Sequence, residues 1–118
     1  MGEANRVRGT LTRREGTEGE VALGPITIAV PHRGLPDGAI DVAIRPESIR
    51  LEAAGTSPLD GTVRKAAYLG HTMEYTVETA IGPLFTIDNR VDLPLAVGSR
   101  VAIAFAPHGV IVIPAAPA

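Results

Sequence analysis

Short stretches in which apolar and polar residues alternate run through most of this chain. Within residues 40–44, 73–79 and 101–105, every second side chain is apolar and those between are polar or small. A period of two is that of a β-strand with one buried face. No window keeps the 3.6-residue period of an amphipathic helix. The pattern therefore predicts an all-β fold.

Turn-forming residues divide the chain into short pieces. Gly24-Pro25 and Gly82-Pro83 predict tight turns. Residues 14–19 and 31–38 predict polar loops, and residues 88–98 predict a longer one. Between these breaks we expect strands at residues 7–11, 21–23, 26–30, 40–44, 49–51, 63–69, 73–79, 84–87, 101–105 and 110–113.

The apolar phase changes side within residues 46–48. Apolar residues occupy even positions before this point and odd positions, Ile49 and Leu51, after it. A strand cannot change face without a bulge or a turn, because its side-chain period is two. Residues 46–48 are therefore predicted to form a single turn of helix or a bend between two strands.

The strand pattern predicts one domain built of two small barrels. Five strands between residues 59 and 113, with a long connection between the third and the fourth, are typical of an OB-type barrel. We expect this OB-fold-like barrel at residues 54–118 and a second, partial barrel from the strands of residues 1–53. An immunoglobulin-like sandwich is the structural alternative, but the cysteine and tryptophan markers of that fold are missing.

Composition and charge narrow the functions that this chain can have. It has 118 residues, of which 45% are hydrophobic and 20% charged, as in an ordinary folded domain. Two tyrosines, two phenylalanines and no tryptophan predict a thin aliphatic core, which dimerisation or docking would stabilise. The net charge of -2 and the pI near 5.9 argue against a nucleic-acid partner. There is no cysteine for disulfide or thiolate chemistry.

Several short motifs follow one another in a recognisable order. The strand that runs into Arg45-Pro46-Glu47 resembles the Arg-Pro-Glu signature of the TOBE domain, a small barrel carried behind the ATPase of many bacterial ABC importers. Further segments resemble landmarks of the same family and extend the resemblance over nearly the whole chain. They are residues 2–9, Gly61-Thr62-Val63, Tyr68-Leu69-Gly70, Tyr75-Thr76-Val77 and residues 98–105.

The resemblance implies a C-terminal regulatory domain of an importer's ATP-binding subunit, of the spermidine/putrescine, ferric-iron or maltose type. It implies a non-catalytic role that supports ATP-driven uptake of a small solute. The implied partners are the ABC ATPase domain, a second copy of this domain and, indirectly, the membrane permease subunits. The implied location is cytoplasmic and peripheral to the inner membrane through the transporter complex.

The sequence has no phosphate-binding loop of the ATPase type. Such a loop needs Gly-x-x-x-x-Gly-Lys-Ser/Thr, whereas the only lysine, Lys65, stands between Arg64 and Ala66. We therefore expect no catalytic residue, no metal and no cofactor in this chain. ATP and Mg would belong to the ATPase domain outside it.

Two groups of residues are candidates for binding or assembly. Glu74 and Glu78 lie on the polar face of the strand at residues 73–79 and are expected to form a solute or subunit face. The family-motif residues are expected to be structural or at an interface, with Arg45 and Glu47 tying the bend to nearby backbone or to each other. These residues are Arg45, Pro46, Glu47, Gly61, Tyr68, Gly70, Tyr75 and Gly98.

Other charged and polar residues receive simpler interpretations. His32, His71 and His108 have no metal-ligand spacing and are expected in solvated loops. The serines lack a nucleophile-elbow context. The N-terminal basic residues are expected to form one cluster at an interdomain surface; they are Arg6, Arg8, Arg13 and Arg14.

Two other functions remain open from the sequence alone. One is the sensing of a polyamine or an oxyanion in a groove between two barrels. The other is oligonucleotide binding, with Tyr68, Tyr75 and Phe85 as a stacking platform for bases. The apolar neighbours of Tyr75 favour core packing instead, and the low basic charge makes oligonucleotide binding the weakest alternative.

Overall fold

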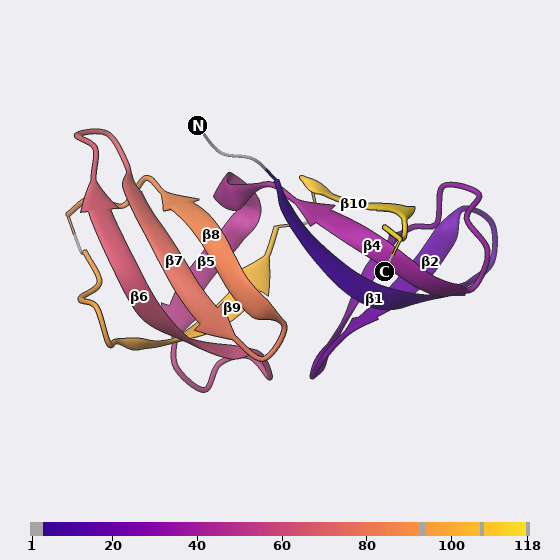
Figure 1. The fold of residues 1–118 in the computed structure, drawn as a ribbon, viewed down its shortest axis with the longest axis horizontal. Helices are drawn as coiled ribbons and strands as arrows, with labels where there is room; N and C mark the ends of the chain where they lie inside the picture. Colours follow the sequence, from indigo (N-terminus) through magenta and orange to yellow (C-terminus); the bar gives the residue numbers. More distant parts are fainter. Residues whose placement is uncertain (1–3, 93, 107, 118) are drawn as a thin grey trace.

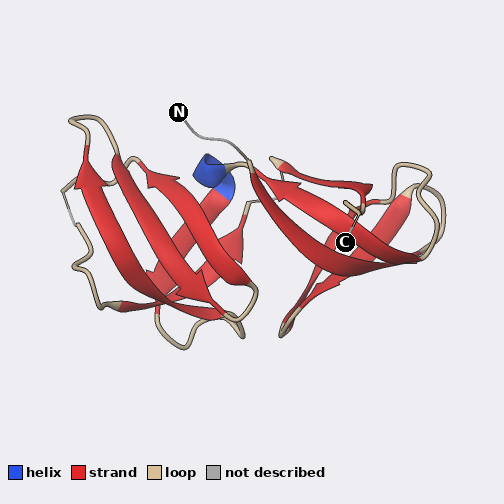
Figure 2. Cartoon of the chain, in the orientation of Figure 1, coloured by secondary structure: helices blue, strands red, loops and turns tan. Residues whose placement is uncertain are grey.

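The computed structural model describes residues 4–92, 94–106 and 108–117. The all-β prediction is confirmed, since strands make up most of the described chain (Figure 2). Gly2 and Pro107, predicted in a family segment and in a turn, lie outside the described residues. The elements are β1 (Asn5–Arg13), β2 (Glu18–Leu23), β3 (Ile26–Pro31), β4 (Gly38–Ile44), the 3-10 helix η1 (Pro46–Ser48), β5 (Ile49–Ala53), β6 (Asp60–Tyr68), β7 (Met73–Thr79), β8 (Gly82–Asp88), β9 (Arg100–Phe105) and β10 (Val110–Pro114).

The strands form two five-stranded antiparallel sheets, each curled into a small barrel, that lie end to end (Figure 1). Barrel A has the strand order β10-β4-β1-β2-β3, and barrel B has the order β5-β9-β6-β7-β8. The molecule extends 42 Å along its long axis and 28 Å across it. Buried side chains from both barrels, from Val7 to Val112, form one hydrophobic cluster. No helix of the described residues is long and apolar enough to span a membrane.

Each barrel is completed by a strand from the other half of the chain. In both halves three consecutive strands form a meander, and the fourth strand pairs with the first, β4 with β1 and β9 with β6. The next strand then crosses over: β5 pairs with β9 in barrel B, and β10 pairs with β4 in barrel A. The two halves therefore share one topology and exchange their fifth strands.

This exchange corrects the expected membership of the second barrel. The sequence predicts that residues 110–113 complete it, but β10 lies in barrel A and β5 takes that place in barrel B. The prediction is wrong because alternation reveals which face of a strand is buried but not which strand lies beside it. The division into residues 1–53 and 54–118 stays a prediction, and the two sheets do not follow it.

Within each strand, alternation positions the core as the sequence predicts. In β7, Met73, Tyr75 and Val77 point inward and are buried, while Glu74 and Glu78 lie on the outer face. The loop between β8 and β9 is long, as expected from residues 88–98. These features place the polar outer faces and the loops where partners or solutes can reach them.

The two crossover segments contact each other between the barrels. The Arg45 backbone N–H donates to the Gly109 carbonyl at 2.9 Å, and the Ala106 N–H donates to the Ser48 carbonyl at 2.8 Å. The Ser48 hydroxyl donates to the His108 carbonyl at 2.9 Å. Gly109 has a φ of +85° and lies against Ser48 so closely that there is no room for a Cβ atom. The crossing therefore requires glycine at this position.

We expect Gly109→Ala to destabilise the fold more than Gly55→Ala. Both glycines have positive φ, +85° and +89°, so each alanine costs about 1 to 2 kcal/mol of backbone strain. A Cβ at Gly55 meets open space, whereas at Gly109 it meets the Ser48 side chain, which should cost about 1 to 3 kcal/mol more. Urea unfolding followed by far-UV circular dichroism measures both losses. Equal losses would show that the crossover segments are not tightly packed.

Candidate functional site

An arginine bridges the open seam of each barrel. The Arg33 guanidinium donates to the Val112 carbonyl across the β3–β10 seam at 3.0 Å. The Arg90 guanidinium donates to the Leu51 carbonyl across the β5–β8 seam at 2.9 Å. Each arginine is the second residue after the third strand of its half, and each carbonyl belongs to the middle residue of a fifth strand. The two bonds are therefore equivalent, and each satisfies an edge carbonyl that has no strand partner on that side.

A side-chain amide at the seam of barrel B joins the two barrels. Asn5, the first residue of β1, donates from its Nδ2 to the Phe85 carbonyl at 2.8 Å and accepts at its Oδ1 from the Phe85 backbone N–H at 2.8 Å. The same Nδ2 is 3.3 Å from the Ile44 carbonyl. The amide thus pairs with the free edge of β8 as a neighbouring strand would.

Beyond Asn5 the seam of barrel B opens into a groove of about 480 Å³. Residues of η1, β5, β8 and the loops next to β7 and β8 line it, and this volume is in the range of small-molecule sites. The lining residues are Glu47, Ile49, Arg50, Glu52, Thr72, Ile87, Asp88, Asn89 and Arg90.

One ion pair dominates the electrostatics of this groove. Arg90 pairs with Asp88 at 2.9 Å and also donates to it from its backbone N–H at 2.9 Å. Burial of Asp88 opposes its ionisation, but the hydrogen bonds from Arg90 outweigh that effect and hold the pKa of Asp88 below its ordinary value. The same hydrogen bonding raises the pKa of Arg90.

The remaining charges leave the groove able to bind a small polar solute. The side chains of Glu47, Arg50 and Glu52 are exposed at its wall and form no ion pair with another described residue. Carboxylates and a guanidinium therefore offer both acceptors and donors. Among the described residues there is no cluster of acidic and histidine side chains that could hold a metal ion.

The Arg-Pro-Glu motif lies where the chain passes from barrel A to barrel B. Pro46 is buried, and residues 46–48 form one turn of 3-10 helix, in agreement with the predicted turn. Arg45 and Glu47 are exposed, and the hydrogen bonds that hold the bend come from Ser48 and from the backbone instead. Of the three motif residues, only Glu47 lines the groove.

The other motif residues are separate from this groove. Gly61 packs against the Val77 side chain, and Tyr75 is buried, with its hydroxyl accepting from the Leu95 N–H at 2.9 Å. This placement of Tyr75 agrees with core packing rather than with a stacking platform. Gly70 and Gly98 adopt positive φ in turns, and Tyr68 is 64% exposed at the end of β6.

Glu74 and Glu78 lie on the outer face of β7, as the alternation predicts. They do not line the groove at the seam of barrel B. Glu74 instead lines a second, shallower groove on the outer face of β6, β7 and β8, together with Lys65 and Phe85. Whether this outer face meets a solute or a subunit stays a prediction.

The histidine prediction is wrong for His32. His71 and His108 are exposed, but His32 is only 6% exposed. Its Nδ1 accepts from the Gly34 N–H at 2.9 Å, so its proton is on Nε2, which lies 2.8 Å from the Gly16 carbonyl. These bonds fix the loop after β3, and no local pattern in the sequence reveals that long-range partner.

The predicted basic cluster is also wrong, because the arginines lie at two ends of β1 and have separate partners. Arg6 and Arg13 are seven residues apart on one strand, roughly 23 Å at about 3.3 Å per residue. At one end, Arg14 pairs with Glu20. At the other, Arg6 and Arg8 pair with Asp41.

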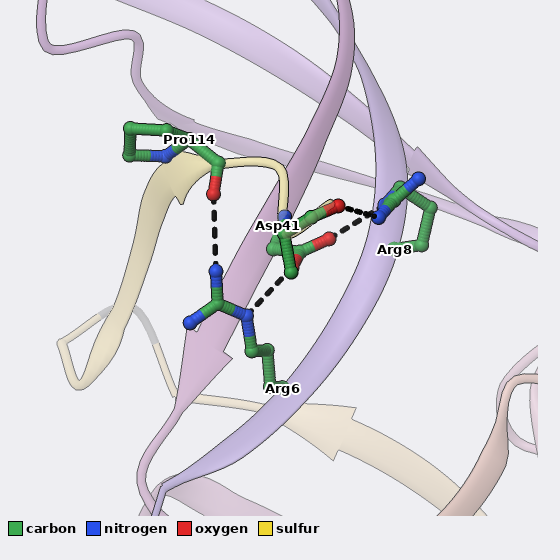
Figure 3. A network of polar contacts seen from close by, with 5 residues as sticks. Arg6, Arg8, Asp41 and Pro114 are labelled. Carbon is green, nitrogen blue, oxygen red and sulfur yellow. Dashed lines mark hydrogen bonds and ion pairs between the residues drawn. The ribbon is translucent and has the colours of Figure 1, made fainter. Parts of the chain in front are cut away.

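The Asp41 network is the feature that sequence reasoning missed (Figure 3). Asp41 is 3% exposed and accepts from Arg6 Nε at 2.6 Å and from Arg8 Nε at 2.7 Å. The same guanidinium groups donate to the carbonyls of Pro114 and Ala116 at 3.1 and 2.8 Å, and the Ala116 N–H donates to Asp41 at 3.1 Å. The C-terminal segment is thereby bound across β4 and β1. An aspartate within an apolar strand is the only signal that the sequence offers.

Comparison with known proteins places this chain among importer components. A family model described as the TOBE domain matches residues 42–113. The Fe(3+) ions import ATP-binding protein FbpC of Rhizobium etli is 39% identical over 113 residues, which is 96% of this chain and 32% of that protein. The spermidine/putrescine import ATP-binding protein PotA of Ruegeria pomeroyi is 28% identical over 110 residues, covering 89% of this chain and 30% of PotA. The chain thus spans about a third of the length of the curated relatives that it matches.

A solved structure shares the fold. The cytoplasmic molybdate-binding protein ModG, in a form with molybdate bound, superimposes with a TM-score of 0.72 over 92% of this chain and 94% of that one. The sequence identity is 17%. The OB-like architecture of paired barrels is therefore found in a protein of distant sequence.

We expect Asp41→Asn to remove part of the acid sensitivity of the fold. Hydrogen bonds from Arg6 and then Arg8 hold the pKa of Asp41 well below its usual range. The unfolded chain therefore takes up a proton first as the pH falls, at its ordinary pKa of about 3.9. The stability contributed by this carboxylate is complete above that value and is lost as the pH falls toward the folded-state pKa.

Urea unfolding at a series of pH values from 7 to 3 tests this expectation. Asp41→Asn should be less stable than the wild type at pH 7, and the difference should shrink below about pH 4. Asp60→Asn is the control, because its ion pair with Arg100 is 3.6 Å long and exposed and should contribute less than about 1 kcal/mol. A difference between Asp41→Asn and the wild type that is independent of pH would contradict the ionic role of Asp41.

Proposed function

The chain belongs to the TOBE domain family, and on that premise we propose that it is the regulatory domain of the ATP-binding subunit of an ABC importer. The observation that carries the proposal is the match to FbpC over nearly the whole chain. By analogy with the named relatives, the transported solute would be ferric iron or a polyamine. The domain itself would be non-catalytic, with ATP and Mg bound in the ATPase domain.

The proposed mechanism is mechanical. Contacts between two copies of the domain hold the two ATPase subunits in register, and a partner that prefers one arrangement shifts the assembly between its open and closed states. The shared core and the exchanged strands support this role, because they make the two barrels a stiff unit. The domain would act in the cytoplasm, associated with the inner membrane through the permease subunits.

Solute sensing is the second candidate function. The groove at the seam of barrel B supports it, since its volume and its mixed charges suit a small polar solute. The groove is lined by three carboxylates, those of Glu47, Glu52 and Asp88, and by the guanidiniums of Arg50 and Arg90. A cation such as a polyamine therefore fits better than an oxyanion such as the molybdate bound by ModG.

Sedimentation velocity over a wide range of protein concentrations tests the first proposal. We expect the chain to self-associate reversibly into a dimer, with a sedimentation coefficient that rises with concentration. A monomer at every concentration would contradict the dimerisation role and leave docking on the ATPase domain as the mode of action.

Thermal unfolding with spermidine, putrescine, ferric citrate or molybdate tests the second. A bound solute raises the melting temperature in proportion to its concentration and affinity. A rise with the polyamines that Glu52→Gln weakens would assign the groove as a solute site. The absence of a rise with all four would exclude sensing of these solutes.

A further inference from the structure

Exposed apolar side chains gather at the end of barrel B that faces away from barrel A. Tyr68 and Leu69 form the tip between β6 and β7 (Figure 1), and Val97 belongs to the loop before β9. These three side chains are between 54% and 64% exposed. Ile111, at 46%, is the remaining large hydrophobic side chain that is exposed among the described residues, and it belongs to barrel A. Single exposed apolar residues are ordinary, but a group of them marks an interaction site.

An internal comparison shows that the fold does not need this apolar tip. The equivalent hairpin in the first half of the chain joins β1 to β2. Its tip, residues 14–17, is polar and also fully exposed. Since both hairpins close the same topology, the tyrosine and leucine of the second one have no evident role in folding. A role in binding accounts for the difference.

The strands behind this tip present a nearly flat outer face. A bulge at Arg64 shifts the pairing of β6 with β7, so that Lys65 lies opposite Thr76 and Ala67 lies opposite Glu74. Without the shift Lys65 would share the inward face of Val63. These outward residues, with Phe85 and Val97, line a shallow groove of about 480 Å³. We call the groove together with Tyr68 and Leu69 the β6–β7 face.

The charges on this face complement each other. Lys65 and Glu74 are diagonal neighbours on adjacent strands. Neither belongs to an ion pair within the described part of the chain. The small side chains of Ala66 and Ala67 lie beside them and permit close approach of another surface. A twofold contact brings the same patch of two copies together, so that each lysine can meet the partner's glutamate.

We propose that the β6–β7 face binds the same face of a second copy of this chain. This inference rests on the proposed dimerisation function and names the surface that performs it. Tyr68 and Leu69 provide the apolar anchors, and the two Lys65–Glu74 pairs set the orientation. A neutral, self-complementary face fits an identical partner better than a strongly charged one.

Sedimentation velocity of the whole chain and of two surface variants tests the apolar part. Leu69→Ser should raise the dissociation constant of the dimer tenfold or more, because a central apolar anchor carries much of the binding energy. Ile111→Ser is the matched control, since it removes an exposed apolar side chain from barrel A and should leave the dimer unchanged. Thermal unfolding confirms that both variants remain folded.

A charge exchange between two variants tests the orientation. Lys65→Glu leaves the face acidic and Glu74→Lys leaves it basic, so each protein alone should dimerise at least tenfold more weakly than the wild type. An equimolar mixture of the two should dimerise again, because both ion pairs can form between unlike copies. Contacts within one chain cannot produce that recovery.

The outcomes separate the surface from the dimerisation role. A wild-type dimer that none of these substitutions weakens overturns the β6–β7 face and leaves dimerisation through another surface. A wild-type chain that is monomeric at every concentration overturns both. Loss of the dimer in Leu69→Ser with recovery in the charge-exchanged mixture supports the assignment.

Discussion

The exchange of fifth strands is the constraint on which the rest of this structure depends. Barrel A lacks an edge until β10 returns to it, and barrel B lacks one until β5 arrives. The two crossover segments must therefore pass each other in the narrow space between the barrels. Buried Pro46, the Ser48 hydroxyl and the absence of a side chain at Gly109 make that passage possible. One continuous core is the result, since each half of the chain contributes strands to both barrels.

Closing a curled sheet leaves edge groups without strand partners, and polar side chains satisfy them here. Arg33 and Arg90 perform the same task at the two seams, which reveals the equivalence of the halves more clearly than the sequence does. The halves then differ in ways that matter for function. The seam of barrel B keeps a polar groove, and its β6–β7 hairpin is apolar where the β1–β2 hairpin is polar. In barrel A, the buried Asp41 instead binds the C-terminal segment.

Local patterns in the sequence were sufficient to predict the strands and the turn at residues 46–48. The alternation of β7 and the phase change before Ile49 follow from the side-chain period of a strand, which is a local property. The partner of β10, the buried His32 and the Asp41 network depend on residues far apart in the sequence. Asn5 and Phe85, for example, are 80 positions apart. The Arg-Pro-Glu motif indicated the family, but only Glu47 of its three residues lines the groove, and Arg90, which closes the seam, belongs to no motif.

If the exchanged strands unite the barrels, the domain can transmit a contact at one end to the other as a rigid body. Native-state amide hydrogen exchange measured by NMR tests this claim most directly, because it gives the free energy of opening strand by strand. We predict that the most protected amides of β5, β9, β4 and β10 exchange with the same free energy, that of global unfolding. A lower opening free energy for all of barrel B, with barrel A still protected, would show two independent units and contradict the account.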